Sequence, residues 1–457
     1  MTRMIKSQKG MKTFIILWVG QLASMIGSGL IGFALAVWIF SQTGQATPFA
    51  LTALFSMLPR ILLSPIAGVV SDRWNRKKVM LISDSLSGVI TIATAYLLYT
   101  HQMQVWMVYL FSFLGSIFAS FQQPAYSASI VMLVPKQQLT RANSLVQMGE
   151  AIETILTPIL AGALFGLIGM GGILLIDIAT YLVAMITLAV VFIPQPEHAD
   201  KEAAEKKSVF QDIAIGWRYL SERRGLLGLL IYFAGVNFLA NISSVLIGPL
   251  VLSFSTATSM GFVQTVMGVG MLAGSTLMSL WGGPEKNRVK MIVGAISLSA
   301  LGFIIAGFRT SLTFIASGMF ILLFFIPFGS GPSSALFASK VEPGVQGRVF
   351  ATRSMISMSM MPFAYLLSGI LADKVFSPLL LAGGPLADTF IGTLLGVGPG
   401  RGIGLMLICS GFLVLLLSGL AYLNPHIRHI ETEIPDVVPD LPEDREGPAS
   451  ASLPTEI

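Results

Sequence analysis

The sequence has little charge, little cysteine and little histidine. Only 11% of its 457 residues are charged and 54% are apolar, whereas an ordinary soluble domain carries roughly 25% charged residues. Because so little polar surface cannot cover a fold in water, lipid must be the solvent for most of the chain. The single cysteine, Cys409, excludes a disulfide framework or a cysteine-type metal site within one chain. The four histidines show no HExxH pattern and no GxSxG is present, so we expect no enzyme, no metal and no cofactor.

Long apolar runs take the place of the missing charge. A span needs about 20 residues, and the sequence predicts an all-α membrane protein with twelve transmembrane helices. The expected spans are 13–40, 48–71, 79–100, 104–134, 143–168, 172–194, 226–254, 259–281, 289–308, 312–338, 351–374 and 401–423. They divide the chain into a first six-helix bundle (1–194), a linker (195–225), a second six-helix bundle (226–424) and a tail (425–457).

The basic residues predict the orientation of these spans. Of the 28 Lys and Arg residues, 24 fall in the N-terminal segment, in the loops 72–78, 135–142, 195–225, 282–290 and 339–353, and in the tail, all on one side. The opposite loops 41–47 and 101–104 contain none. Because basic loops remain cytoplasmic, both termini are expected inside a bacterial cytoplasmic membrane. The net charge of +5 is therefore a topology signal, and nucleic acid is not an expected partner.

Two segments are expected outside the bilayer. In the linker, Phe210, Ile213, Trp217 and Leu220 share one helical face, which predicts a helix that either lies in the membrane interface or packs on the protein. From Ile430 onward the tail has five prolines and eight carboxylates. This composition buries too little apolar surface to offset the ordering entropy, so the tail is expected to be disordered.

The two bundles repeat a short pattern. Pro124 stands before Val134-Pro135 at the same spacing as Pro332 before Glu342-Pro343, and an arginine follows in each half. Duplicated six-helix halves are typical of secondary transporters, whose site lies between the halves at mid-depth. The repeat therefore favours a pseudo-symmetric transporter fold.

The segment that joins the second and third spans carries a more specific pattern. The residues GVVSDRWNRKK (68–78) resemble the G-x-x-x-D-R-x-G-R-K signature of the major facilitator superfamily, with Asn75 in place of a glycine. The segments 121–145, 174–182 and 366–380 are similar to its drug:proton antiporter branch, which includes macrolide-efflux proteins and the enterobactin exporter. The resemblance implies a gating role for the motif residues Gly68, Asp72, Arg73, Arg76 and Lys77.

The resemblance also implies that a proton gradient supplies the energy. One part of the antiporter pattern is degenerate, because only Pro158 and Gly162 match GP-x-x-GG in the fifth span. The arginine that many drug antiporters carry in the fourth span is also missing from 104–123. These departures leave coupling to protons as one alternative beside another form of coupling.

Ionisable residues inside spans are candidates for that coupling, because charge in hydrocarbon is costly. Glu150 and Glu153 lie one helical turn apart on one face, and Glu153 is about 15 Å beyond Asn143, near the midplane. We predict that the two glutamates are coupling acids and that Arg60 is their counter-ion; the alternative is a structural ion pair. Asp84 and Asp177 are predicted to be structural or coupling residues.

Polar residues in the first, seventh and eighth spans predict a substrate cavity. This set comprises Gln21, Ser28, Asn237, Asn241 and Gln264. Hydrogen bonds between helices explain the same residues equally well.

The leading hypothesis is a monomeric efflux transporter that exports a hydrophobic drug-like compound or metabolite by alternating access. A siderophore or lysophospholipid carrier is a second transport hypothesis, which predicts a basic cavity. A membrane sensor or scaffold is the alternative outside transport.

Overall fold

The computed structural model describes residues 2–193, 209–284 and 286–437, and these residues are almost entirely helical. Five helices form the first half of the chain: α1 (Thr2–Thr43), α2 (Ala46–Arg73), α3 (Arg76–Tyr99), α4 (Val105–Leu133) and α5 (Leu139–Val190). The second half contains α7 (Arg224–Ser244), α8 (Ile247–Leu252), α9 (Ala257–Trp281), α10 (Arg288–Phe308), α11 (Leu312–Lys340), α12 (Gln346–Leu371) and α15 (Arg401–Leu423). Shorter elements are η1 (Lys136–Gln138), α6 (Val209–Ser221), η2 (Ala372–Phe376), α13 (Ser377–Leu379), α14 (Phe390–Leu395), α16 (Pro425–Arg428) and α17 (Ile430–Glu433).

The described residues contain eleven helical segments that are long and apolar enough to cross a membrane. One of them, Lys136–Val190, is 55 residues long and therefore more than twice the length of a span. Its backbone is non-helical at Gly169, where φ is 64°, a value that glycine adopts without steric cost. Gly169 therefore divides α5 into two spans, and the twelve predicted spans are all present.

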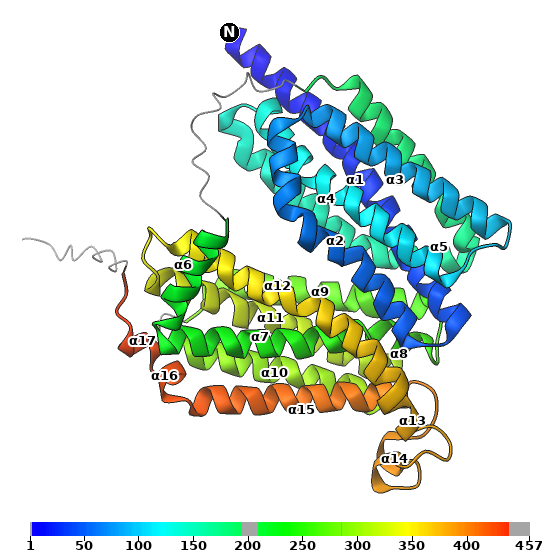
Figure 1. Ribbon diagram of the computed structural model, residues 1–457, viewed down its shortest axis with the longest axis vertical. Helices are drawn as coiled ribbons and strands as arrows, with labels where there is room; N and C mark the ends of the chain where they lie inside the picture. The colour runs from blue at the N-terminus through cyan, green and yellow to red at the C-terminus, as the bar shows by residue number, and fades with distance from the viewer. Residues whose placement is uncertain (1, 194–208, 285, 438–457) are drawn as a thin grey trace, which may run out of the picture.

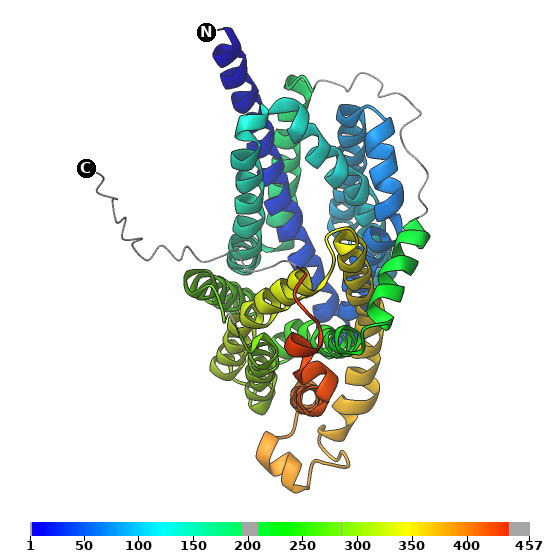
Figure 2. The ribbon, with the colours of Figure 1, turned by 90° about the vertical axis from the view of Figure 1, so that its left-hand side faces the viewer.

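The helices form two groups that converge at one end (Figure 1). We call the end that carries the N-terminus, the α2–α3 loop and α16–α17 the basic end, and the other end, which carries the α1–α2 loop and α13–α14, the opposite end. Figure 2 looks onto the basic end, with α1–α5 above and α7–α15 below.

Three apolar cores hold these helices together. One core joins both halves at the opposite end, where Leu30 and Phe33 of α1 belong to the same cluster as Leu246 and Met260. At the basic end each half has a core of its own, one around Phe14 and Met80 and the other around Leu226 and Phe337. The halves are therefore packed together at the opposite end in this conformation.

The linker helix α6 packs on the second half. Its Leu220 is fully buried, and a side chain on Gly216 would meet Arg348 and Thr352 of α12. Trp217 remains 48% exposed, so the face that contacts the protein is centred on Ile213, Gly216 and Leu220. Of the two alternatives for this helix, the structure shows packing on the protein; residues 194–208 lie outside the described part of the chain.

The prediction of a disordered tail is wrong for residues 425–437. Ile427 and Ile430 are buried in the core of the second half. The Glu431 carboxylate accepts hydrogen bonds from Asn287 N (2.9 Å) and Val289 N (3.0 Å) at the start of α10. The prediction from composition fails here because two buried isoleucines and one carboxylate at a helix start are enough to anchor a short segment. Residues 438–457 lie outside the described part.

Lys340, at the end of α11, is the second anchor of this segment. It is only 3% exposed, and its Nζ donates to the carbonyl oxygens of Glu431 (2.8 Å) and Ile434 and pairs with the Asp436 carboxylate at 3.1 Å. The segment 425–437 thus fixes the basic-end termini of α10 and α11 to each other.

Removal of the Glu431 carboxylate is expected to destabilise the protein. Glu431→Ala leaves two backbone N–H groups at the start of α10 without their acceptor, a loss of about 1 kcal/mol. Thermal unfolding of the purified protein in detergent measures the effect. Glu433→Ala is the matched control, because Glu433 pairs with His426 on the exposed surface and accepts no hydrogen bond from α10 among the described residues. Equal unfolding temperatures for the two variants would contradict the anchoring role.

Candidate functional site

The two halves meet at the opposite end through close helix packing. A Cβ on Gly261 of α9 would lie 2.4 Å from Pro158 O and 3.0 Å from Gly162 Cα of α5. Thr258 Oγ1 donates to Gly162 O at 2.9 Å. The two residues that match the antiporter pattern, Pro158 and Gly162, therefore lie where α5 and α9 cross. Only glycine allows these backbones to approach so closely.

An acidic side chain joins the two halves at a second contact, between the end of α12 and the start of α2. Asp373 follows α12 in the π-helical turn η2, and its carboxylate accepts from Ala46 N (2.9 Å) and Thr47 N (2.7 Å) at the start of α2. A carboxylate at a helix N-terminus satisfies free N–H groups and the helix dipole together. Asp373 was missed by sequence reasoning because the predicted span ends at residue 374 and its partner is 327 residues away.

Removal of this charge is expected to open the opposite end. In Asp373→Asn the two charge-assisted hydrogen bonds weaken, each of which is worth about 1.5–3 kcal/mol. Ser255→Cys in a Cys409→Ser background reports the change, because Ser255 lines a cavity of about 520 Å³ at this end. We expect Asp373→Asn to react faster with an impermeant maleimide. Asp388→Asn, an exposed acid in the same loop region, serves as the control, and equal rates in both variants would contradict the gate.

The α2–α3 loop holds the basic end of the first half. Arg76 Nη1 donates to Ala128 O at 2.8 Å, and Lys77 Nζ donates to the carbonyl oxygens of Ala189 (2.8 Å) and Val191 (2.7 Å). These two cations thus tie α3 to α4 and α5. The backbone of Asp72 and Arg73 belongs to α2, and their side chains lie outside the described part of the structure.

The structure also shows the surroundings of Gly68 and Asn75 in this motif. A Cβ on Gly68 would meet nothing within 4 Å, so Gly68 makes no close helix approach in this conformation. Asn75 has φ −64° and is not left-handed. Its side chain accepts from Lys78 N at 3.0 Å and caps α3, which is a role that asparagine fills and glycine fills less well.

The predicted coupling residues lie on α5 and α2. Glu153 is partly buried, and the charged groups whose fields reach its carboxylate belong to Glu150 and Arg60. Glu150 and Arg60 are exposed on the protein surface. Among the described residues no ion pair within 4.0 Å joins Arg60 to either glutamate, so the three groups act on one another at longer range in this conformation.

A second cation, Arg353, lies within a long helix of the other half. The sequence places Arg353 where the loop 339–353 overlaps the predicted span 351–374, and the structure places it inside α12, seven residues from its start. Its guanidinium stacks on the rings of Phe337 (4.7 Å) and Phe233 (5.3 Å) and donates to Ser333 Oγ at 2.9 Å. Because α12 begins at Gln346, five residues before the predicted span, Arg353 lies two turns inside the helix.

The buried aspartates form hydrogen bonds within the first half. Gln21 Nε2 donates to Asp84 Oδ2 at 3.5 Å, and Gln122 Nε2 donates to Gln21 Oε1. Asp177 accepts from Thr91 Oγ1 at 2.9 Å. Asp84 is 8% exposed and Asp177 is 4% exposed. Gln21 therefore takes part in bonds between α1, α3 and α4.

The remaining polar residues predicted to line the cavity are less buried than Gln21, and their hydrogen bonding is more local. Asn241 Nδ2 donates to Asn237 O within α7 at 2.7 Å. Asn237, Asn241 and Gln264 are partly buried, and Ser28 is exposed. These four residues come from three helices, and no hydrogen bond found among the described residues joins the two halves through them.

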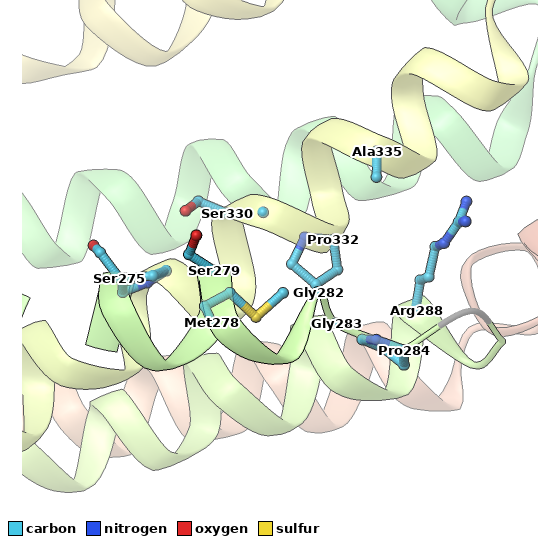
Figure 3. Close-up of a pocket in the computed structure, with 12 residues that line it drawn as sticks. Ser275, Met278, Ser279, Gly282, Gly283, Pro284, Arg288, Ser330, Pro332 and Ala335 are labelled. Carbon is cyan, nitrogen blue, oxygen red and sulfur yellow. The ribbon is translucent and has the colours of Figure 1, made fainter. Parts of the chain in front are cut away.

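A cavity of about 450 Å³ lies in the second half at the basic end (Figure 3). Its lining combines hydroxyl groups, a thioether and one cation: Ser275, Met278, Ser279, Gly282, Gly283, Pro284, Arg288, Pro327, Ser330, Gly331, Pro332 and Ala335. Ser275 and Ser279 continue the face of α9 on which Gly261 and Gly268 meet α5. The cavity itself is bounded by α9, α11 and the start of α10. Its size is in the range of small-molecule sites.

Two six-span halves that share a core at one end and have separate cores at the other define a multi-pass membrane transporter. The profile of the Major Facilitator Superfamily matches residues 17–365, and the chain belongs to this superfamily. Macrolide efflux protein A of Streptococcus pyogenes is 29% identical over 375 residues, which cover 79% of this chain and 90% of that protein. Macrolide efflux protein A of Enterococcus faecalis is 29% identical over 322 residues, 67% of this chain and 96% of that protein.

More distant relatives agree on the fold. Enterobactin exporter EntS of Citrobacter koseri is 21% identical over 295 residues, 63% of this chain and 68% of that protein. A bacterial homologue of the human lysosomal transporter Spinster, in an inward-facing and unoccupied conformation, has a TM-score of 0.64 at 13% identity, covering 90% of this chain and 96% of that one. A bacterial homologue of ferroportin in an inward-facing state has a TM-score of 0.63 at 15% identity, covering 90% of this chain and 98% of that one.

Proposed function

We propose that this protein exports hydrophobic, drug-like compounds, macrolides foremost, across a bacterial cytoplasmic membrane by alternating access and that proton influx drives the export. The 29% identity to macrolide efflux proteins over most of both chains carries the proposal of efflux. The basic end is then cytoplasmic, as the excess of Lys and Arg in its loops favours. The protein works as a monomer, because each chain contains both halves of the transport unit.

The separation of the apolar cores supports the proposed direction of access. The halves share a core and the Asp373 contacts at the opposite end, whereas each has its own core at the basic end. This conformation is the one in which a substrate enters from the cytoplasm. The 450 Å³ cavity beside Ser275 and Ser279 lies at that entry side and offers hydroxyl groups and apolar surface to an oxygen-rich amphiphile.

The glutamates on α5 support coupling to protons. Desolvation and a neighbouring like charge favour protonation of a carboxylate, and a neighbouring cation favours its ionised form. Glu153 has both kinds of neighbour, Glu150 and Arg60. A cationic substrate that approaches Glu153 replaces its proton, so binding of the substrate and release of the proton become a single exchange.

Arg353 supports a second candidate, an anionic substrate such as a siderophore. Its guanidinium lies between α7, α11 and α12 with aromatic rings and a serine as partners. Among the described residues no carboxylate lies within 4.0 Å of it. An acidic substrate would supply the missing counter-ion.

Drug susceptibility of an efflux-deficient bacterial host tests the proposed function. The host expresses the wild-type chain, Glu153→Gln or Glu222→Gln, and is challenged with macrolides, other drug classes and catecholate siderophores. Glu222 is an exposed linker residue that pairs with Arg218, so Glu222→Gln controls for expression. We expect higher macrolide resistance with the wild type and Glu222→Gln and none with Glu153→Gln. Resistance to no compound at normal membrane expression would favour a sensor or scaffold and overturn the proposal.

A further inference from the structure

A buried carboxylate stands apart from the glutamates on α5. Asp84 of α3 is 8% exposed, and among the described residues no lysine, arginine or histidine nitrogen lies within 4.0 Å of its carboxylate. Arg76 and Lys77, about two turns away along α3, point to backbone carbonyls of α4 and of the end of α5. Within the described part of the structure Asp84 thus has no counter-ion in this conformation.

Two amides connect Asp84 to neighbouring helices. Gln21 of α1 is 3% exposed, donates to Asp84 Oδ2 at 3.5 Å and accepts from Gln122 of α4. An amide carries a donor and an acceptor, so it can adjust to either protonation state of the acid. The chain Asp84–Gln21–Gln122 therefore joins α3, α1 and α4.

The titratable groups around the hydrogen-bonded residues Asp84, Gln21 and Gln122 are acids and phenols. On α5, the ring of Tyr181 packs against Gly88, one turn beyond Asp84, and Asp177 accepts from Thr91, two turns beyond it. On α4, Tyr126 lies one turn beyond Gln122 and is buried. None of these groups supplies positive charge to Asp84.

An ionised carboxylate in such surroundings is costly. Its burial is compensated only by partners of opposite charge or by several hydrogen bonds. Asp84 receives one amide hydrogen bond at the long limit of the accepted range. These surroundings therefore favour the neutral acid over the carboxylate in this conformation.

From this geometry we infer that Asp84 is a second proton-binding site, which holds a proton while Gln21 and Gln122 remain paired and releases it when a substrate displaces that pair. The inference rests on the proposed function and adds to Glu153 a second group that carries a proton in the substrate-free state. On release the O–H bond of Asp84 breaks, the proton passes to a cytoplasmic water molecule, and the electron pair stays on the carboxylate. The anion then needs a closer donor, which Gln21 supplies by moving toward it.

Infrared spectroscopy of the full-length protein in lipid tests protonation directly, because a protonated carboxyl group has its own C=O stretching band. The spectrum of the wild type minus that of Asp84→Asn isolates the Asp84 band at neutral pH. We expect this band to be present, to move in Gln122→Ala, and to be unchanged in Gln123→Ala, the matched neighbour on α4. A difference spectrum without the band would show that Asp84 is ionised and overturn the inference, whether or not the protein exports drugs.

A transport assay tests the release step with erythromycin as the probe. In proteoliposomes, Asp84→Asn is expected to retain erythromycin exchange and to lose uphill transport driven by a proton gradient; erythromycin should also abolish the Asp84 band in the wild type. If the wild type transports erythromycin and the band persists in its presence, release by displacement is wrong. If the wild type shows the band but moves no protons, the proposed coupling fails and the protonation of Asp84 stands.

Discussion

Glu153→Gln is expected to abolish uphill efflux while leaving exchange of substrate across the membrane intact. The amide keeps the size of the side chain but cannot release a proton, so the substrate no longer has a proton to exchange with. A lost coupling free energy of about 1–3 kcal/mol corresponds to a 5- to 150-fold loss of accumulation. Energised inverted membrane vesicles with a radiolabelled macrolide measure the accumulation.

The variant Glu150→Gln distinguishes the role of Glu150 from that of Glu153. Glu150 is more exposed than Glu153 and is one source of the field at Glu153. Its neutralisation removes the like charge, so uphill efflux should continue with an optimum at lower pH, because Glu153 then loses its proton more readily.

Full uphill efflux in Glu153→Gln, with expression equal to that of the wild type, would remove Glu153 from the mechanism.

Gly261→Leu is expected to reverse the conformational preference of the protein. A side chain at Gly261 collides with Pro158 O and Gly162 Cα, so α5 and α9 separate at the opposite end. Overpacking costs about 1–3 kcal/mol, which shifts a two-state ratio by about 5- to 150-fold. Export should fall because the state that is open at the basic end is depleted.

Spin labels across the basic end measure this shift. Ser144→Cys on α5 and Ser279→Cys on α9 are exposed positions on opposite halves, placed in a Cys409→Ser background. We expect a shorter distance in Gly261→Leu, because the basic end closes as the opposite end opens. Gly294→Leu is the matched control, since a Cβ there meets nothing within 4 Å. An unchanged distance in Gly261→Leu would mean that this contact does not set the conformation.

Features set by local sequence were predicted well. The positions of the spans follow from runs of apolar residues, and Gly169 ends the fifth span because its backbone is left-handed. Pro158 and Gly162 match a local sequence pattern of the fifth span, and they lie where the two halves cross. In each case the determinant is contained in a few neighbouring residues.

Features set by the rotation and docking of helices were not predicted. Gln21 bonds Asp84 over 63 residues, and Asp373 caps α2 over 326 and 327 residues. Helical periodicity shows which residues share a face but not which helix that face meets. The tail was judged by its composition, whereas the three residues Ile427, Ile430 and Glu431 decide how it packs.

Proton movement in proteoliposomes tests the central proposal most directly. The purified chain is reconstituted with a pH-sensitive dye in the lumen, and erythromycin is added on the side that corresponds to the cytoplasm. The account predicts erythromycin uptake into the lumen, with proton exit from it, in the wild type and no proton movement in Glu153→Gln. Erythromycin uptake at the same rate with no proton movement, and no response to an imposed pH gradient, would contradict it.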